Sequence, residues 1–175
     1  MMRRLIDGQL ATLGDVERRI EQLEAELGVL QKQMDKANTL RLVPGIGLLG
    51  ATALAATLGD GRGWRSGREF SASLGLVPAH AGSGGKVRIG SLSKHGDPYL
   101  RTLLIHGARS VITHAKVKPE WLERLLARRP LNVAVAALAN KMARTAWALV
   151  AHGRVYQREW KSTPPKGCAA QAAAA

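Results

Sequence analysis

Cysteine, aromatic residues and uninterrupted apolar runs are scarce in this chain of 175 residues, which has one Cys, four Trp, two Tyr and one Phe. Cys168 alone cannot form an intramolecular disulfide, so a reducing cytoplasm is the expected compartment. The most apolar late stretch, residues 133–150, is interrupted by Asn140, Lys141 and Arg144. Each charge at a bilayer centre costs about 2.5–3.5 kcal/mol. The sequence therefore predicts a cytoplasmic protein that does not contact the membrane.

Acids are also scarce, since 13 Asp and Glu oppose 26 Lys and Arg, which gives a net charge of +13. This balance favours a polyanionic partner over a small neutral substrate. The charge is unevenly distributed: residues 1–35 carry five cations and seven acids, and the remaining 140 residues carry +15. We therefore expect nucleic acid to contact the later part of the chain, and the first segment to have another role.

Recognisable metal and nucleotide motifs are absent. The histidines have no zinc-ligand spacing with the single cysteine. A Walker phosphate loop would need glycine where His80 stands and a hydroxyl where Val87 stands. A hydrolase elbow would need a preceding strand and Gly-x-Ser-x-Gly, from which the glycines around Ser83 are offset. Acids after residue 35 are few and scattered: Asp60, Glu69, Asp97, Glu120, Glu123 and Glu159. The sequence predicts no cofactor and no metal site within this chain.

Apolar residues in the first segment recur with a seven-residue period. One heptad position holds Ile6, Leu13, Ile20, Leu27 and Met34, and the other holds Val16, Leu23, Leu30 and Ala37, with Gln9 as a break. This pattern predicts a long N-terminal coiled-coil helix over residues 1–38. The alternative is a long amphipathic helix packed on its own domain. An exposed seam would be an apolar stripe, so we expect a second copy of the chain, or a missing neighbour, to cover it.

The remaining sequence predicts a mainly α fold, with a compact helical domain over residues 39–152 and a disordered tail over residues 153–175. Helix-start signals are Ser66 with Glu69, Asp97 with Pro98, Pro119 with Glu120, and Asn132. The expected helices cover residues 66–74, 97–113, 118–127 and 132–151. The last of them is expected to bury Val135, Leu138, Met142, Ala146 and Leu149.

The turn Pro44-Gly45-Ile46-Gly47 lies between two apolar helical segments and has the spacing of a helix-hairpin-helix motif. In such a motif the glycine-lined turn and the free amides of the following helix can hold a nucleic-acid phosphate. This predicts a phosphate contact at Gly45, Ile46 and Gly47 that positions the protein without reading bases. An ordinary helix turn ended by glycine, or a turn kept for packing, remains the alternative.

One serine lies among glycines and cations in residues 78–101. Ser83 stands between Gly82 and the pair at 84–85, so the backbone could turn sharply in a Gly/Ser loop or small hairpin. The residues expected to bind phosphate or DNA nearby are Lys86, Arg88, Ser93, Lys94 and Arg101. A hydroxyl needs a base to become a nucleophile, and the candidates are His80, His95 or a group outside this chain. A flexible Gly-Ser loop with solvated charges is the alternative.

Four separated motifs occur in an order that closely resembles the C-terminal transposase domain of the IS-one-ten family of insertion-sequence transposases. They are Leu-Val-Pro-Gly-Ile-Gly at 42–47, Gly-Leu-Val-Pro at 75–78, Ser-Gly-Gly-Lys-Val-Arg-Ile-Gly at 83–90, and Leu-Ser-Lys-His-Gly-Asp at 92–97 followed by Tyr-Leu-Arg-Thr-Leu-Leu at 99–104. The resemblance covers roughly residues 38–150. The heptad arm resembles the coiled coil that precedes this domain in the family.

The resemblance implies DNA transposition by a serine recombinase. In such proteins the serine matching Ser83 forms a covalent phosphoserine link with DNA, a RuvC-like domain binds Mg²⁺, and a structured non-coding bridge RNA directs target choice. Nothing in this chain resembles the RuvC-like domain, so we expect a truncated or expressed fragment that is inactive alone. The alternative is a DNA- or RNA-binding, dimerising remnant without chemistry. A purely structural coiled-coil protein would leave the basic body unexplained.

Overall fold

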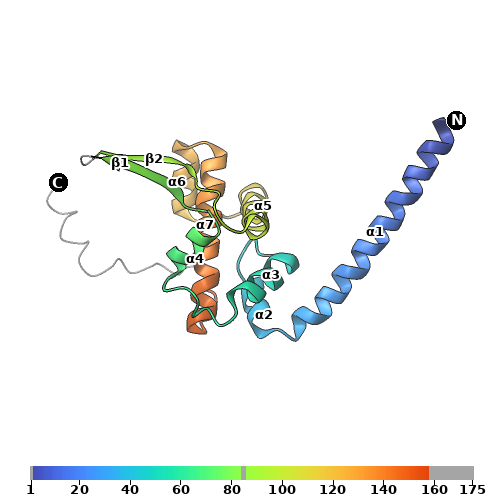
Figure 1. The fold of residues 1–175 in the computed structure, drawn as a ribbon, viewed down its shortest axis with the longest axis horizontal. Coiled ribbons are helices and arrows are strands. Elements are labelled where there is room, and N and C mark those ends of the chain that lie inside the picture. Colours follow the sequence, from blue (N-terminus) through green and yellow to red (C-terminus); the bar gives the residue numbers. More distant parts are fainter. Residues whose placement is uncertain (1, 84–85, 158–175) are drawn as a thin grey trace.

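The computed structural model describes residues 2–83 and 86–157, except for the side chains at 80, 81, 83 and 86–89. Figure 1 shows a long helix that leads into a group of shorter helices, from which one β-hairpin projects. The predicted mainly α fold is confirmed. The elements are α1 Met2–Lys32, α2 Asp35–Arg41, α3 Leu48–Leu58, α4 Gly67–Ser73, β1 Pro78–Ser83, β2 Lys86–Leu92, α5 Pro98–His114, α6 Glu120–Arg128 and α7 Leu131–His152. Cys168, Gly84, Gly85 and the predicted tail beyond residue 157 lie outside the described residues.

Helix α1 extends away from the other helices over most of its length (Figure 1). Its seam is exposed: Leu13 retains 54% of its surface and Ile20 retains 50%. Within the part of the chain that the structure describes, no heptad partner covers this seam, so the alternative in which this helix packs along its own domain is wrong for these residues.

The continuous seam predicted through residue 37 is wrong at its end, because α1 stops at Lys32. Met34 has an extended backbone with φ −106° and ψ 95°, and α2 begins at Asp35. Ala37 and Leu40 are fully buried and belong to the core of the body. Burial of α2 against α3 therefore overrides the heptad register at this point.

A polar joint connects α1 to α2. Gln31 is only 4% exposed. Its Nε2 donates to Asn38 Oδ1 at 2.8 Å, and its Oε1 accepts from Arg41 Nη1 at 2.9 Å. Asn38 Nδ2 also donates to the carbonyl of Lys32 at 3.2 Å. A buried amide left without partners would cost about 1–3 kcal/mol, so these bonds fix the bend between the two helices.

Helix α7 is the centre of the body, where it packs against α4, α5 and α6. All five residues predicted to face inward from this helix are buried. The predicted start at Asn132 is wrong, because α7 begins at Leu131 after Pro130. Asn132 Oδ1 accepts instead from Arg109 Nη2 at 3.1 Å, which links α7 to α5. Proline fixes φ near −65° and needs no amide partner, so Pro130 can begin the helix without a polar cap.

Two other helix starts follow the sequence. Asp97 Oδ1 accepts from the amides of Tyr99 at 2.8 Å and Leu100 at 3.1 Å, which caps α5. Ser66 Oγ accepts from the amide of Glu69 at 3.3 Å and caps α4. In the described part of the chain, no helix combines the length and apolarity needed to cross a membrane.

Candidate nucleic-acid interface

The predicted nucleophile lies at the end of the first strand of the β-hairpin. The antiparallel register pairs Ser83 with Lys86 and Ala81 with Arg88. Directly opposed residues in such a ladder belong to the same face of the hairpin. The backbone therefore assigns the positions of Ser83, Lys86 and Arg88 to one face at the far end of the hairpin. Of the two forms predicted for this segment, the small hairpin is the one observed.

Three other predicted site residues lie at the base of the hairpin. The amide of Ser93 donates to the carbonyl of Val77 at 3.0 Å, which closes the ladder beside the helices. Lys94 follows with a positive φ of 55°, an uncommon conformation for a residue other than glycine. Arg101, in the first turns of α5, donates through Nη1 to the carbonyl of Leu74 at 3.0 Å. Part of the Arg101 guanidinium thus holds the end of α4.

Close backbone packing fixes this base. A Cβ at Gly75 would lie 2.9 Å from Arg101 Nη1 and 2.9 Å from the carbonyl carbon of Lys94. A Cβ at Gly96 would lie only 1.8 Å from the carbonyl oxygen of Ser73. Only glycine fits at these two positions, and both have positive φ. At this end of the hairpin, Lys94 and Arg101 are therefore held close to the backbone of Gly75.

The hairpin separates the predicted cations into two groups. Strand β1 has six residues between Val77 and its end at Ser83. At about 3.3 Å per residue, the distance from Val77 to Ser83 along the strand is about 20 Å. Lys86 and Arg88 accompany Ser83, whereas Lys94 and Arg101 remain at the base. The structure does not bring all four cations around one serine.

The Pro44–Gly47 turn forms a third group beside α5. Gly45 has a φ of +88°, and a Cβ there would lie 2.8 Å from the carbonyl oxygen of Gly107. Ile46 is buried, whereas Gly47 is exposed at the N-cap of α3 without a side-chain cap. This turn is packed on one side and leaves the first-turn amides of α3 without a capping side chain.

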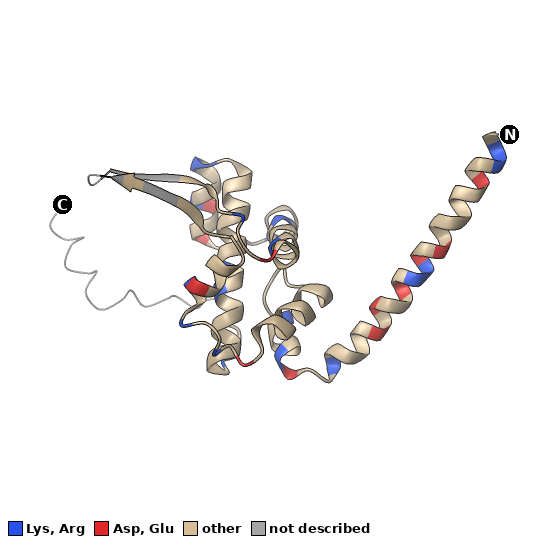
Figure 2. Cartoon of the chain, viewed as in Figure 1, with Lys and Arg blue, Asp and Glu red and all other residues tan. Residues whose placement is uncertain are grey.

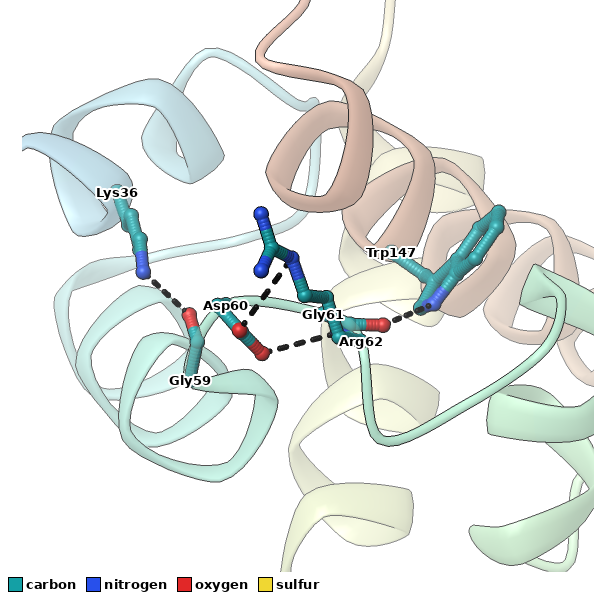
Figure 3. A network of polar contacts seen from close by, with 6 residues as sticks. All are labelled: Lys36, Gly59, Asp60, Gly61, Arg62 and Trp147. Carbon is teal, nitrogen blue, oxygen red and sulfur yellow. Dashed lines mark hydrogen bonds and ion pairs between the residues drawn. The ribbon is translucent and has the colours of Figure 1, made fainter.

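A rigid loop lies between α3 and α4 (Figure 3). Trp147 Nε1 donates to the carbonyl of Gly61 at 3.0 Å, and Lys36 Nζ donates to the carbonyl of Gly59 at 2.6 Å. Asp60 accepts from the amide of Arg62 at 3.0 Å, and its other oxygen lies 3.6 Å from Arg62 Nε. The residues that anchor this loop, Lys36 and Trp147, are distant from it in the chain, so no local sequence pattern indicates these contacts.

Charge differs between the two ends of the molecule (Figure 2). Acidic and basic residues are interspersed along α1, whereas basic residues predominate on the helices and loops of the body. Among the described residues, no three His, Cys, Asp or Glu side chains gather in a way that could hold a metal ion. The described residues therefore offer Mg²⁺ no fitting donor set.

Two cations on α7, Lys141 and Arg144, were not singled out as candidate binding residues from the sequence. Both are exposed on α7, and Lys141 Nζ lies 4.4 Å from the centre of the Trp121 ring. Partial burial, and secondarily the Arg144 charge, lower the pKa of Lys141 from its usual 10.5. The available signal was the presence of two cations one turn apart in an otherwise apolar helix.

Known proteins match this chain over most of its length. The sequence model described as the Transposase IS116/IS110/IS902 family matches residues 37–124. A probable family 20 transposase of Pseudomonas aeruginosa is 45% identical over 156 residues, covering 83% of this chain and 46% of the relative. The transposase for insertion sequence element IS1111A of Coxiella burnetii is 37% identical over 160 residues, covering 89% of this chain and 44% of that protein.

A third relative is the transposase for insertion sequence element IS1328 of Yersinia enterocolitica, which is 40% identical over 143 residues. That match covers 79% of this chain and 43% of the relative. The chain therefore spans less than half the length of each of these three proteins.

Proposed function

Because this chain belongs to the Transposase IS116/IS110/IS902 family, we propose that it provides the Ser83-bearing part of a DNA transposase. The observation that carries this proposal is the register of the β-hairpin within the family-matched residues. It assigns Ser83, Lys86 and Arg88 to one face of the hairpin. A hydroxyl with two cations on the same face suits attack on a phosphodiester.

In the proposed reaction, Ser83 Oγ attacks a DNA phosphorus atom and loses its proton to a base. The bond from that phosphorus to a sugar oxygen breaks, and the released sugar oxygen takes up a proton. The DNA phosphate is then joined to Ser83, and no oxidant or reductant is consumed. Lys86 and Arg88 offset the negative charge that develops on the phosphoryl oxygens.

The base for Ser83 is assigned to another part of the assembly. His95 lies at the end of the hairpin nearest the helices, about 20 Å from Ser83 along the strand. His80 precedes Ser83 by three residues, so it occupies the alternate face of β1. A RuvC-like domain elsewhere in the transposase is the proposed source of the base and of bound Mg²⁺.

The remaining predicted residues are proposed to hold the DNA backbone away from the reacting phosphate. Ser93, Lys94 and Arg101 would contact one section near the hairpin base. The amides around Gly45, Ile46 and Gly47 would contact another, because unpaired first-turn amides attract phosphate. Such contacts set the position of the DNA and carry no sequence information.

Helix α1 is proposed to pair with the α1 of a second copy. Its exposed apolar residues keep a seven-residue period from Ile6 to Leu30, which is typical of a coiled-coil seam. The alternative function, a nucleic-acid-binding and dimerising remnant without chemistry, is favoured by this seam and by the net positive charge of the body. A structured RNA is a further partner that we propose on the sequence resemblance.

Covalent trapping tests the proposed function. The chain, supplemented with the remaining half of a family transposase and Mg²⁺, is incubated with a nicked suicide DNA substrate. A protein-DNA adduct that survives denaturation is expected for the wild type and for Ser91→Ala, which removes an exposed serine from the same hairpin. Ser83→Ala should abolish the adduct, because no other group in the proposal supplies the attacking oxygen.

The two readings give opposite results in this assay. Equal adduct yields for the wild type and Ser83→Ala would remove Ser83 from the reaction. Loss of the adduct in Ser91→Ala as well would attribute the effect to hairpin folding. Salt-dependent DNA binding with no adduct from any variant supports the non-catalytic alternative.

A further inference from the structure

A second basic surface lies along α7 and α4, apart from the hairpin. It consists of Arg62, Arg65, Arg68, Lys141 and Arg144, all of which are exposed. Lys141 and Arg144 are three residues apart and share one face of α7. The other three come from the loop between α3 and α4 and from the first turn of α4.

Close contacts hold these two parts of the surface together. A Cβ at Gly67 would lie 3.0 Å from the carbonyl oxygen of Arg144 and 3.2 Å from the Trp147 ring. A Cβ at Gly61 would lie 2.9 Å from Cβ of Ala151, and Trp147 Nε1 donates to the Gly61 carbonyl (Figure 3). The loop is therefore fixed on α7 at two levels, and its arginines are presented from a rigid backbone.

The acids near this surface are already engaged with backbone amides. Asp60 accepts from the amide of Arg62 and also lies 3.6 Å from the Nε of that residue, and Glu69 Oε2 accepts from the amide of Arg65 at 2.7 Å. On the neighbouring α6, Glu120 lies 3.7 Å from Arg124, and Glu123 is exposed. Five cations thus face two acids on the surface itself, and the repulsion of Arg144 contributes to the lowered pKa of Lys141.

Three aromatic rings beside this surface, those of Trp64, Trp121 and Trp147, are half-buried and are not presented as open platforms for stacking on bases. Lys141 Nζ covers Trp121, Trp64 makes an edge contact with Phe70 at 4.9 Å, and Trp147 makes one with His152 at 5.2 Å. Proteins that hold single strands rely on exposed aromatic platforms, whereas duplex backbones are held by cations. The surface therefore fits duplex phosphates better than unpaired bases.

We propose that the second basic surface binds the phosphate backbone of duplex DNA outside the section held by the hairpin. This inference rests on the DNA partner of the proposed function and adds a second contact to it. Neutralisation of Lys141 and Arg144 by phosphate relieves the repulsion between them. The contact is independent of base sequence, because cations on a rigid backbone meet phosphates alone.

The test is the salt dependence of DNA binding by the full chain. Fluorescence anisotropy with a labelled duplex of about 20 base pairs is measured between about 50 and 200 mM salt. Two double variants remove charge from the surface: Lys141→Gln with Arg144→Gln, and Arg62→Gln with Arg68→Gln. Each should reduce the slope of log binding constant against log salt concentration by about two in magnitude, because each lost phosphate contact removes about 0.9.

A matched pair, Lys32→Gln with Lys116→Gln, removes the same charge from exposed residues outside the surface and should leave the slope nearly unchanged. Thermal melting checks that every variant is folded. Because Arg62 and Arg68 do not cover an aromatic ring, their pair remains informative if the loss of Lys141 weakens packing on Trp121.

Each outcome decides between the proposals. Equal slopes for all three pairs would overturn the second basic surface but leave the Ser83 reaction intact. Absence of duplex binding by the wild type would overturn both the surface and the DNA partner. A larger loss with a duplex RNA probe than with DNA would overturn the assignment to DNA. An adduct lost only in Ser83→Ala, together with reduced slopes in both surface pairs, supports both proposals.

Discussion

Helix α1 and the body use similar apolar residues in opposite ways. In the body, leucines such as Leu54 are almost completely removed from solvent, whereas Leu23 on α1 keeps 51% of its surface. The body is strongly basic and the first segment carries a net charge of −2. The comparison teaches that the body buries its apolar residues against one another, whereas α1 leaves its own apolar residues exposed to solvent.

The largest expected effect compares one leucine from each region. Leu54→Ala should lower the free energy of unfolding of the body by about 2–5 kcal/mol, because it opens a cavity in a packed core. Leu23→Ala should change it by less than about 0.5 kcal/mol. Urea unfolding followed by tryptophan fluorescence measures this, since Trp64, Trp121 and Trp147 report on the body and α1 has no tryptophan. A large effect of Leu23→Ala would show that α1 folds as part of the body.

The next effect compares one glycine from each region. At Gly107 a Cβ would lie 1.9 Å from the carbonyl oxygen of Gly45, so Gly107→Ala should destabilise the body by about 1–3 kcal/mol. At Gly14 no atom lies within 4 Å of an added Cβ, so Gly14→Ala should stabilise α1 by about 0.5–1 kcal/mol through helix propensity.

Two measurements check this pair of glycines. Fluorescence melts follow Gly107→Ala, and amide hydrogen exchange within α1 follows Gly14→Ala. Destabilisation by both substitutions would contradict the view that only the body is close-packed.

The smallest expected effect concerns the charge density of the body. Burial, and then Arg144, lower the pKa of Lys141 in the folded chain. The folded state therefore binds fewer protons than the unfolded state between that lowered pKa and the usual 10.5, and stability rises with pH in this window.

Arg144→Gln should raise the pKa of Lys141 only in part, because burial is the larger cause. NMR titration of the Lys141 side chain measures this, with Arg124→Gln as the control. An unchanged pKa in Arg144→Gln would exclude the proposed repulsion.

Local signals in the sequence were sufficient for much of the fold. Asp97 and Ser66 cap helices where their spacing predicts, because a cap depends on residues within one turn. The spacing of apolar residues along α7 also predicted correctly which face of this helix is buried. Ala37 and Asn132 were misplaced because contacts with α3 and Arg109, distant in the chain, decide their roles.

The candidate site was only partly predictable. The motifs around Ser83 identify the family and the candidate nucleophile, but the spacing of its cations depends on how strands β1 and β2 pair. A sequence places Lys94 eleven residues from Ser83 without showing that a hairpin intervenes. The second basic surface was missed because Trp147 and Gly67 bring its two parts together across long sequence distances.

The joint at Gln31 has a consequence for any assembly of this protein. Since hydrogen bonds fix the bend between α1 and α2, helix α1 keeps a set orientation relative to the body. In the pairing of α1 helices that we propose, a partner bound to α1 would therefore also set the orientation of the β-hairpin that carries Ser83. The separation of the two Ser83 residues in such a pair would then depend on the crossing angle of the two α1 helices, far from either serine.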